Sequence, residues 1–398
     1  MTQYNILILN QISPHGLGRL PAAHYKVGKD IANPDAILVR SHNMLDMSIP
    51  ESVRAIGRAG AGTNNIPVAE MSQRGVPVFN APGANANAVK ELVLAGVLMA
   101  ARNLVPALRF VEQLPALAES LDAMVEEGKK QFAGVELPRR TLGIIGLGAI
   151  GGLVADTAIK LGMKVLGYDP EITVDAAWRL HSGVRKAHSI DDVLKNSDFV
   201  TLHVPLLPIT RNMIDAKRVE GMRPGTVLLN FSREGIVDED AVLEGIKQHK
   251  IKYYVCDFPS NKLHGHAQVL ALPHLGASTQ EAEENCAVMV AEQVRDYLEN
   301  GNILHAVNFP NVEMPRESPY RVAIANANVP NMLGQISTAM ASAGLNIHNM
   351  VNKSRGDMAY TLVDVDSPVE LKATKQIAAI AGVLSVRAIP VQPQEPHD

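Results

Sequence analysis

The chain has 398 residues, of which 46% are hydrophobic, and a formal net charge of −4 at pH 7. This length predicts two or three domains with a substantial core, and the charge excludes the basic field that nucleic-acid-binding proteins carry. No apolar run is long enough to span a bilayer, so we expect a cytoplasmic protein with neither a membrane nor a nucleic-acid partner. Cys256 and Cys286 form no CxxC pair, which predicts neither a disulfide framework nor a metal site.

Short apolar runs alternate with polar stretches in the first part of the chain, a pattern typical of α/β domains. The runs are Ile6–Leu9, Ala36–Val39, Val53–Ile56 and Val76–Phe79. Open α/β sheets bind ligands beyond the carboxyl ends of their strands, so the loops after these runs are candidates for substrate contact. They contain Arg40, Arg58, Gly60 and Asn85. The alternative, that their glycine and asparagine residues only form turns, stays open.

After an apolar helix expected over Val89–Leu104, the segment Thr141–Asp169 predicts a strand, a glycine turn, a helix and a second strand. Its turn has the GxGxxG spacing, with Gly146, Gly148 and Gly151. The first two glycines allow a tight turn and close approach of a pyrophosphate, the third allows helix and strand to pack closely, and the helix N-terminus presents N–H groups to the phosphates. Together with the strand and helix around it, this motif predicts a dinucleotide site rather than a plain turn.

The second strand of this unit ends at Asp169. A carboxylate there would accept hydrogen bonds from the adenosine ribose diol and would repel a 2′-phosphate. The sequence therefore predicts NAD rather than NADP as the cofactor.

Further buried strands are expected over Phe199–Pro205, Thr226–Asn230 and Tyr253–Asp257, which continue a doubly wound parallel sheet to about residue 280. The helix expected over Glu281–Asn300 can return to the first domain, which makes that domain discontinuous. We thus expect a flavodoxin-like substrate domain over residues 1–92 and 283–310, and a Rossmann-type nucleotide-binding domain over residues 93–282.

Residues 311–319 contain two prolines among polar residues and are expected to form a linker. Residues 320–391 predict the order βαββαβ, a ferredoxin-like domain. The tail Gln392–Asp398 is expected to be disordered.

Two further segments carry candidate chemistry: NFSREGIVD over residues 230–238 and PHLGAST over residues 273–279. With GLGAIG and Asp169, they resemble the D-isomer-specific 2-hydroxyacid dehydrogenases over nearly the whole chain. Oxidation of a 2-hydroxy acid needs a base for the hydroxyl proton, and histidine suits that role because its pKa lies near working pH. An arginine can clamp the substrate carboxylate through two hydrogen bonds.

The resemblance implies that His274 is the acid/base and Arg233 the substrate clamp. It also implies cofactor contacts from Gly146, Gly148, Ala149, Ile150, Gly151, Asp169, His203, Pro205, Phe231, Ser232, Arg233, Asp257, His274, Gly276 and Ala277. No metal is implied.

The C-terminal domain, with Asn328 before its first helix and Asn346 after it, is similar to an ACT domain, a regulatory module that binds amino acids. In this family that addition favours the branch that oxidises 3-phospho-D-glycerate to 3-phosphohydroxypyruvate, the first step of serine biosynthesis. The small phosphorylated substrate would be held by Arg40 and Arg58, with Lys129 as a further cation. L-serine, if it binds, is expected at Asn326, Asn328 and Asn346, between modules of a homo-oligomer, a dimer or a tetramer. Asn326 stands where serine-regulated members of the family carry a histidine. The alternative, that these asparagines only cap turns, stays open.

The chain departs from the family pattern beside the histidine. The glutamate expected five residues after the strand-end Asp257 falls on Asn261 or Lys262, and Glu234 stands where a glycine is usual. The missing glutamate leaves open a catalytically silent, NAD-responsive regulator on the same fold. A second alternative is a reductase of another 2-keto acid, such as hydroxypyruvate or glyoxylate.

Overall fold

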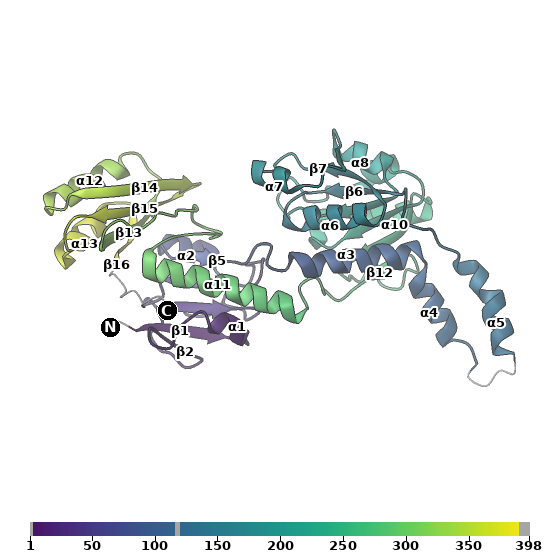
Figure 1. The fold of residues 1–398 in the computed structure, drawn as a ribbon, viewed down its shortest axis with the longest axis horizontal. Helices are drawn as coiled ribbons and strands as arrows, with labels where there is room; N and C mark the ends of the chain where they lie inside the picture. The colour runs from purple at the N-terminus through teal and green to yellow at the C-terminus, as the bar shows by residue number, and fades with distance from the viewer. Residues whose placement is uncertain (1–2, 116–119, 390–398) are drawn as a thin grey trace. The chain divides into compact units, whose positions relative to one another are not determined.

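The computed structural model describes residues 3–115 and 120–389. It divides into two compact units: unit 1 consists of Met1–Asn85 and Gln280–Asp398, and unit 2 of Ala86–Thr279 (Figure 1). The division falls at the starts of helices α3 (Ala86–Ala101) and α11 (Gln280–Asn300). The boundaries expected at residues 92 and 282 lie inside these helices, a few residues later.

Unit 1 begins with a parallel sheet in the order β2-β1-β3-β4-β5. Its strands are β1 (Tyr4–Leu9), β2 (Tyr25–Gly28), β3 (Ala36–Val39), β4 (Ala55–Arg58) and β5 (Val78–Phe79), and its short helices are α1 (Pro14–Leu17) and α2 (Val68–Gln73). Helix α11 returns from the far part of the chain and packs against α1 and β4. The discontinuous, flavodoxin-like sheet is thereby confirmed, although β2 was not predicted and β4 lies two residues further along the chain.

Unit 2 holds a parallel sheet of seven strands in the order β12-β11-β10-β9-β6-β7-β8. The strands are β6 (Thr141–Ile145), β7 (Lys164–Tyr168), β8 (Val184–Lys186), β9 (Phe199–Leu202), β10 (Thr226–Asn230), β11 (Ile251–Cys256) and β12 (Val269–Ala271). The helices are α6 (Ala149–Lys160), α7 (Val174–Arg179), α8 (Ile190–Asn196), α9 (Ala216–Gly221) and α10 (Glu239–Lys247). This is the predicted Rossmann-type arrangement, with edge strands β8 and β12 in addition.

A helical extension of unit 2 begins after α3 (Figure 1). It consists of α4 (Leu104–Glu112), α5 (Leu121–Gly128) and the 3₁₀ turn η1 (Lys129–Phe132). Asn103, in the left-handed conformation with φ 52°, separates α3 from α4 and ends the helix that was predicted to run to Leu104. Among the described residues no single helix is long and apolar enough to cross a membrane; α3 and α4 would qualify only as a pair bent by 67°.

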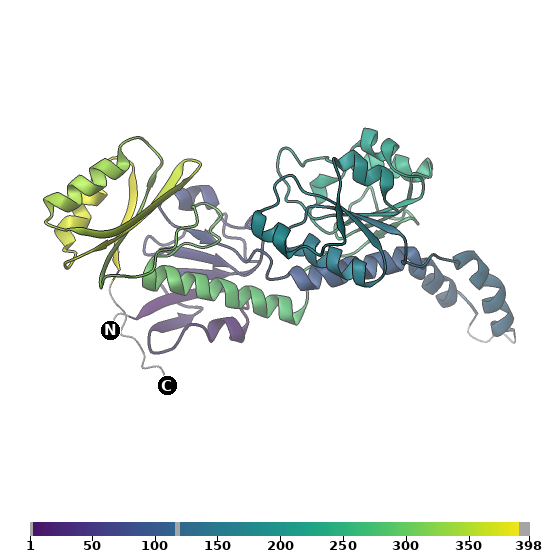
Figure 2. The same cartoon turned by 45° about the horizontal axis from the view of Figure 1, so that its top comes forward.

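The last part of unit 1 is an antiparallel sheet in the order β14-β15-β13-β16, which confirms the ferredoxin-like βαββαβ fold. Its elements are β13 (Tyr320–Ala327), α12 (Met332–Ser342), β14 (Ile347–Arg355), β15 (Met358–Val365), α13 (Leu371–Ala378) and β16 (Val383–Ile389). We call this segment the C-terminal module. Its two helices pack on the same face of its sheet, as Figure 2 also shows. The tail predicted to be disordered lies outside the described residues.

The other face of the module's sheet belongs to the core of the substrate domain. Tyr360 and Leu362 of β15 join one buried cluster with Phe79, Tyr297 and Phe309. Gly301, just after α11, marks how close the contact is, because a Cβ there would lie 2.5 Å from Cδ1 of Ile389. The module and the parallel sheet of unit 1 therefore share a core.

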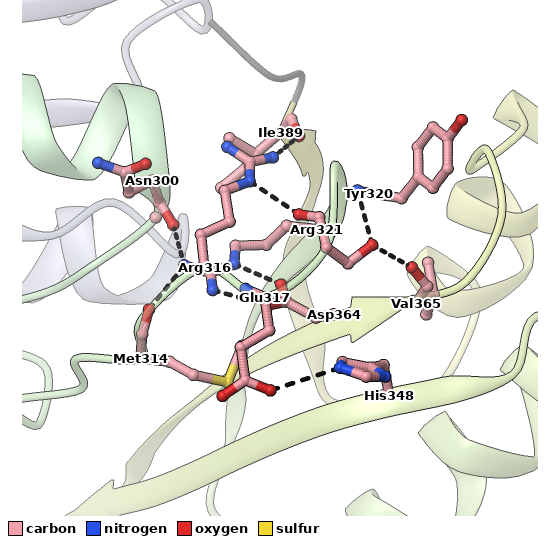
Figure 3. A network of polar contacts seen from close by, with 12 residues as sticks. Asn300, Met314, Arg316, Glu317, Tyr320, Arg321, His348, Asp364, Val365 and Ile389 are labelled. Atoms are coloured by element: carbon pink, nitrogen blue, oxygen red, sulfur yellow. Dashed lines mark hydrogen bonds and ion pairs between the residues drawn. The ribbon is translucent and has the colours of Figure 1, made fainter. Parts of the chain in front are cut away.

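A polar network joins the module to the end of α11 (Figure 3). Arg321 and Asp364 form an ion pair with fully buried side chains and an Nε–Oδ1 distance of 2.6 Å. Arg321 also donates to the carbonyls of Asn300, Met314 and Pro315. Because these bonds fix the segment that was expected to be a linker, residues 311–319 form a hydrogen-bonded joint.

The carbonyl groups at the C-terminus of α11 are satisfied by side chains from outside the helix. Arg387 donates to the carbonyls of Tyr297 and Leu298, Arg316 to that of Glu299, and Tyr360 to that of Gly301. Cationic side chains at this end also complement the negative pole of the helix dipole. The module thus caps the helix that crosses unit 1.

Candidate active site

The glycine turn after β6 has the geometry of a phosphate-binding loop. A Cβ at Gly146 would lie 2.4 Å from the carbonyl oxygen of His203, and one at Gly151 would lie 2.0 Å from that of Gly146. A Cβ at Gly148 would meet nothing within 4 Å, so this side of the turn is open. Helix α6 starts at Ala149 without a side-chain cap, which leaves its first N–H groups, including that of Ile150, for an anion.

Asp169 lies beside this turn, directly after β7. Its carboxylate accepts hydrogen bonds from the backbone N–H of Leu147, at 2.8 Å, and of Glu171, at 3.0 Å. The carboxylate is therefore held in place before any nucleotide binds, which fits a ribose diol.

Replacing Asp169 with alanine should lower the ratio of kcat/KM for NAD to that for NADP by about tenfold or more, because a charge that repels the 2′-phosphate is lost. NAD binding should weaken as well, since the Leu147 N–H loses its acceptor. Steady-state kinetics with both cofactors measure the ratio. The exposed neighbour Glu171 offers a control, Glu171→Ala, which should keep it; equal use of both cofactors by the unaltered protein would contradict the assignment.

His203 follows β9 and lies against the glycine turn. Its Nε2 is 3.0 Å from the hydroxyl of Thr201, and its Nδ1 is buried without a partner. Burial lowers the pKa of His203 to about 3, so the imidazole is neutral at working pH. An unpartnered buried nitrogen beside an open phosphate loop fits a bound nucleotide. Pro205, the next predicted contact, is exposed.

The loop that carries Arg233 is organised by Asn230, the buried last residue of β10. Asn230 donates to the carbonyl of Arg233, at 2.9 Å, and accepts from the N–H of Ser232, at 3.2 Å. The hydroxyl of Ser232 reaches the carbonyl of Leu202 on the neighbouring strand, and Phe231 is buried. Arg233 has extended backbone and an exposed side chain, whose Nη1 donates to the carbonyl of Ser232 at 2.6 Å. Sequence reasoning missed this role of Asn230, although an amide at the end of an apolar strand was its signal.

His274 lies on a loop whose backbone is hydrogen-bonded to the side chain of Asp257. The backbone of His274 is left-handed, with φ 58°, and its exposed ring packs edge-on against Phe258 at 5.2 Å. The buried carboxylate of Asp257 accepts from the N–H groups of Leu275, at 2.7 Å, and Gly276, at 2.8 Å. Asp257 therefore positions the backbone that carries the histidine and the following Ala277.

No described residue gives the His274 ring a hydrogen bond or an ion pair with a carboxylate. Lys262 instead pairs with Asp240 at 2.6 Å. Glu234 begins the 3₁₀ turn η2 (Glu234–Ile236) with an exposed side chain. Phe258 and the backbone bonds of Asp257 are thus the contacts that orient His274.

The predicted substrate contacts Arg40, Arg58 and Gly60 cluster in unit 1. Arg58, the last residue of β4, donates from Nε to the carbonyl of Arg40 at 3.1 Å. Arg40 forms an ion pair with Glu283 of α11, a residue that sequence reasoning did not select. Asn85, half-buried, ends the first segment of unit 1.

Within a single chain, Lys129 and the loop that carries His274 lie near opposite ends of α3. It belongs to η1 and pairs with Glu126 at 2.5 Å. Val89, near the start of α3, is close to Gly276, where a Cβ would lie 3.5 Å from Val89 Cγ2, whereas η1 packs on α4 beyond the other end of α3. The part of α3 from Val89 to Ala101 spans about 18 Å, so the predicted substrate contact of Lys129 is not formed within a single chain.

The predicted effector residues lie at two ends of the C-terminal module. Asn328 donates to the carbonyl of Gly356, and Asn326 is buried with an unpartnered Oδ1. Asn346 bonds through its N–H to Asp366 at the opposite end of β15. Strands of eight residues separate the two ends by about 26 Å, so Asn328 and Asn346 of the same module are too far apart to contact one ligand.

Comparison with known proteins places this geometry in a family. Residues 94–276 match the family model described as the NAD binding domain of D-isomer specific 2-hydroxyacid dehydrogenase. The chain is 34% identical over 367 residues to D-3-phosphoglycerate dehydrogenase of Escherichia coli K12, which covers 88% of this chain and 85% of that protein. The chain belongs to the D-isomer-specific 2-hydroxyacid dehydrogenase family. It is accordingly an oxidoreductase that acts on a CH–OH group with NAD as cofactor.

Other relatives agree with this placement. D-3-phosphoglycerate dehydrogenase of Methanocaldococcus jannaschii is 33% identical over 370 residues, which are 90% of this chain and 67% of that protein. The NAD⁺-bound 3-phosphoglycerate dehydrogenase structure of Entamoeba histolytica has a TM-score of 0.60 at 24% identity and covers 77% of this chain and 99% of that one. At this identity the structural likeness shows the fold. Among the described residues no cluster of histidine, cysteine and carboxylate side chains could hold a metal ion.

Proposed function

We propose that this dehydrogenase oxidises 3-phospho-D-glycerate to 3-phosphohydroxypyruvate, the first step of serine biosynthesis. The observation that carries the proposal is the pair of guanidinium groups, Arg40 and Arg58, at the ends of neighbouring strands β3 and β4. A phosphate group needs such cations with several directed donors, whereas glycerate or lactate does not. The names of the relatives support the same substrate class.

In the proposed reaction, His274 takes the proton of the C2 hydroxyl as the C2 hydride leaves. NAD, when bound, accepts that hydride. Arg233 binds the substrate carboxylate and polarises the C2 oxygen as it becomes a carbonyl, which stabilises the developing charge. The exposed ring of His274 then releases its proton to solvent, so the hydroxy acid has lost one hydride and one proton.

Initial rates of NADH formation with 3-phosphoglycerate, D-glycerate and D-lactate at equal concentration test the proposal. We expect 3-phosphoglycerate to give the highest kcat/KM. A higher value for D-glycerate or D-lactate would assign the site to an unphosphorylated acid.

Arg233→Lys should lower kcat/KM by about 10–100-fold through both a higher KM and a lower kcat, because a single ammonium replaces a fork that holds two oxygens. Arg211→Lys, a matched change at an exposed arginine of the same unit, should leave both constants within about twofold of their original values. An Arg233→Lys enzyme that keeps its original KM would argue against the clamp.

Homo-oligomerisation is part of the proposal. The helical extension exposes the apolar side chains of Leu104, Leu108, Val111 and Leu121, which a second copy could cover. In the module, edge strand β14 offers unpaired backbone groups to a second module. Such pairing would let Asn328 of one copy and Asn346 of another share one amino-acid ligand, for which we propose L-serine. The cytoplasmic location stays a prediction from composition.

A further inference from the structure

Arg40 and Arg58 form a compact cationic pair. In the parallel pairing of β3 and β4, Val39 lies opposite Arg58, so Arg40 follows one residue later on the adjacent strand. The absent side chain of Gly60 leaves room for the Arg58 guanidinium, since a Cβ there would lie 1.8 Å from its Nη1. The hydrogen bond from Arg58 to the Arg40 carbonyl further holds the two residues together.

Glu283, in the first turn of α11, faces this pair from another part of the sequence. Its Oε1 lies 2.7 Å from Nη2 of Arg40, and the two side chains are 43% and 34% exposed. Because both retain access to water, the pair can exchange partners with an incoming anion.

Cys286 lies within electrostatic reach of all three charges. The thiol lies one helical turn after Glu283 and is buried. Burial raises its pKa, the positive charges of Arg58 and Arg40 oppose that rise, and the negative charge of Glu283 adds to it. All three charged groups therefore act on the same buried sulfur atom.

We propose that Glu283 is a specificity-determining residue that weakens the binding of phosphorylated 2-hydroxy acids relative to unphosphorylated ones. The inference rests on the proposed function in placing the substrate phosphate at Arg40 and Arg58. Glu283 neutralises one of the two guanidinium charges there, so a phosphate must compete with a carboxylate that is already bound.

The expected effect follows from charge. A phosphate monoester carries about −1.5 to −2 at pH 7, so Glu283 repels it more than it repels a neutral hydroxymethyl group at the same place. Removing one negative charge at about 6 Å from a dianion in a water-like medium should strengthen its binding by about three- to tenfold. D-glycerate, whose carboxylate is assigned to Arg233, should gain less than about twofold.

Glu283→Gln, which keeps the size of the side chain, tests the inference in the full-length protein. We expect KM for 3-phosphoglycerate to fall about three- to tenfold with kcat nearly unchanged, and KM for D-glycerate to stay nearly constant. Glu283→Asp retains the charge and should keep the original preference. Glu284→Gln makes the same charge change at the next residue, which pairs with His15, and should alter neither constant.

Calorimetric titration with inorganic phosphate at constant ionic strength gives a second readout that does not depend on the substrate. Glu283→Gln should bind phosphate about three- to tenfold more tightly than the original protein and the Glu284→Gln control. Unchanged or weaker phosphate binding in Glu283→Gln would overturn the inference, even if 3-phosphoglycerate proves to be the substrate. Tighter phosphate binding in an enzyme that does not oxidise 3-phosphoglycerate would overturn the proposed function and leave the inference standing.

Discussion

His274→Ala should lower kcat by about 10²–10⁴-fold while the affinity for NADH stays nearly the same. The ring of His274 is exposed on a loop whose backbone is fixed by Asp257, so its removal takes away the proton acceptor without disturbing the buried bonds beneath it. The glycine turn and Asp169, which the nucleotide needs, lie on other strands of the sheet. Steady-state rates and an NADH fluorescence titration measure the two quantities.

His266→Ala is the matched control, because His266 is an exposed histidine in the preceding loop. It should keep kcat within about twofold. Near-normal turnover in His274→Ala would mean that the proton leaves by another group and would contradict the acid/base role of His274.

Asp364→Ala should destabilise unit 1 by about 3–5 kcal/mol, because it leaves Arg321 charged, fully buried and without its carboxylate partner. Arg321 fixes the joint to Asn300, Met314 and Pro315, so the loss should extend to the substrate domain. Urea unfolding followed by circular dichroism measures the effect. NADH affinity, which depends on unit 2, should change little.

The double variant Arg321→Met/Asp364→Leu tests whether the unpaired charge of Arg321 causes the loss of stability. It replaces both charges by apolar side chains and should recover most of the lost stability, since no unpaired charge remains. A double variant as unstable as Asp364→Ala would show that the hydrogen bonds from Arg321 to the three carbonyls, rather than the unpaired charge, determine stability at this position.

The same pair predicts a response to acid. Burial alone would raise the pKa of Asp364, but the hydrogen bonds from Arg321 and from the N–H of Glu317, with the positive charge of Arg321, hold it below its usual value. A depressed carboxyl pKa contributes stability above the unfolded pKa of about 3.9, and this contribution is lost as pH falls through the folded value. The original protein should therefore lose more stability below about pH 4 than the double variant.

The parts of the site that could be predicted from the sequence are those that depend on residues close together in the chain. Gly146, Gly148 and Gly151 are fixed by one turn between adjacent elements, and Asp169 ends the next strand, so spacing alone identifies them. The contact between Glu283 and Arg40 could not be predicted in this way. It depends on where α11 crosses the sheet of unit 1, which no local pattern specifies.

The roles of Asn230 and Asp257 could be identified only once the register of the sheet was known. Each is a polar residue at the end of an apolar strand, a visible signal, but its partners are backbone groups of a loop whose conformation sequence does not give. The edge strands β2, β8 and β12 were missed because three or four residues carry little periodicity.

The joint between module and substrate domain also had a sequence signal that was not used, the unbroken apolar run Val322–Ala325. Strands β13 and β15 are buried along nearly their whole length, without the alternation of a sheet that faces water on one side. Continuous burial of an antiparallel strand requires a cover on both faces. One cover is provided by α12 and α13, and the other by the core shared with α11.

The substrate assignment is tested most directly in the reductive direction, by NADH consumption with 3-phosphohydroxypyruvate, hydroxypyruvate and glyoxylate under identical conditions. Only the first of these carries the phosphate for which Arg40 and Arg58 are proposed. We expect the largest kcat/KM for 3-phosphohydroxypyruvate, with the advantage reduced about tenfold or more in Arg58→Gln. A larger kcat/KM for hydroxypyruvate or glyoxylate in the original protein would contradict the proposal and identify the enzyme as a reductase of an unphosphorylated 2-keto acid.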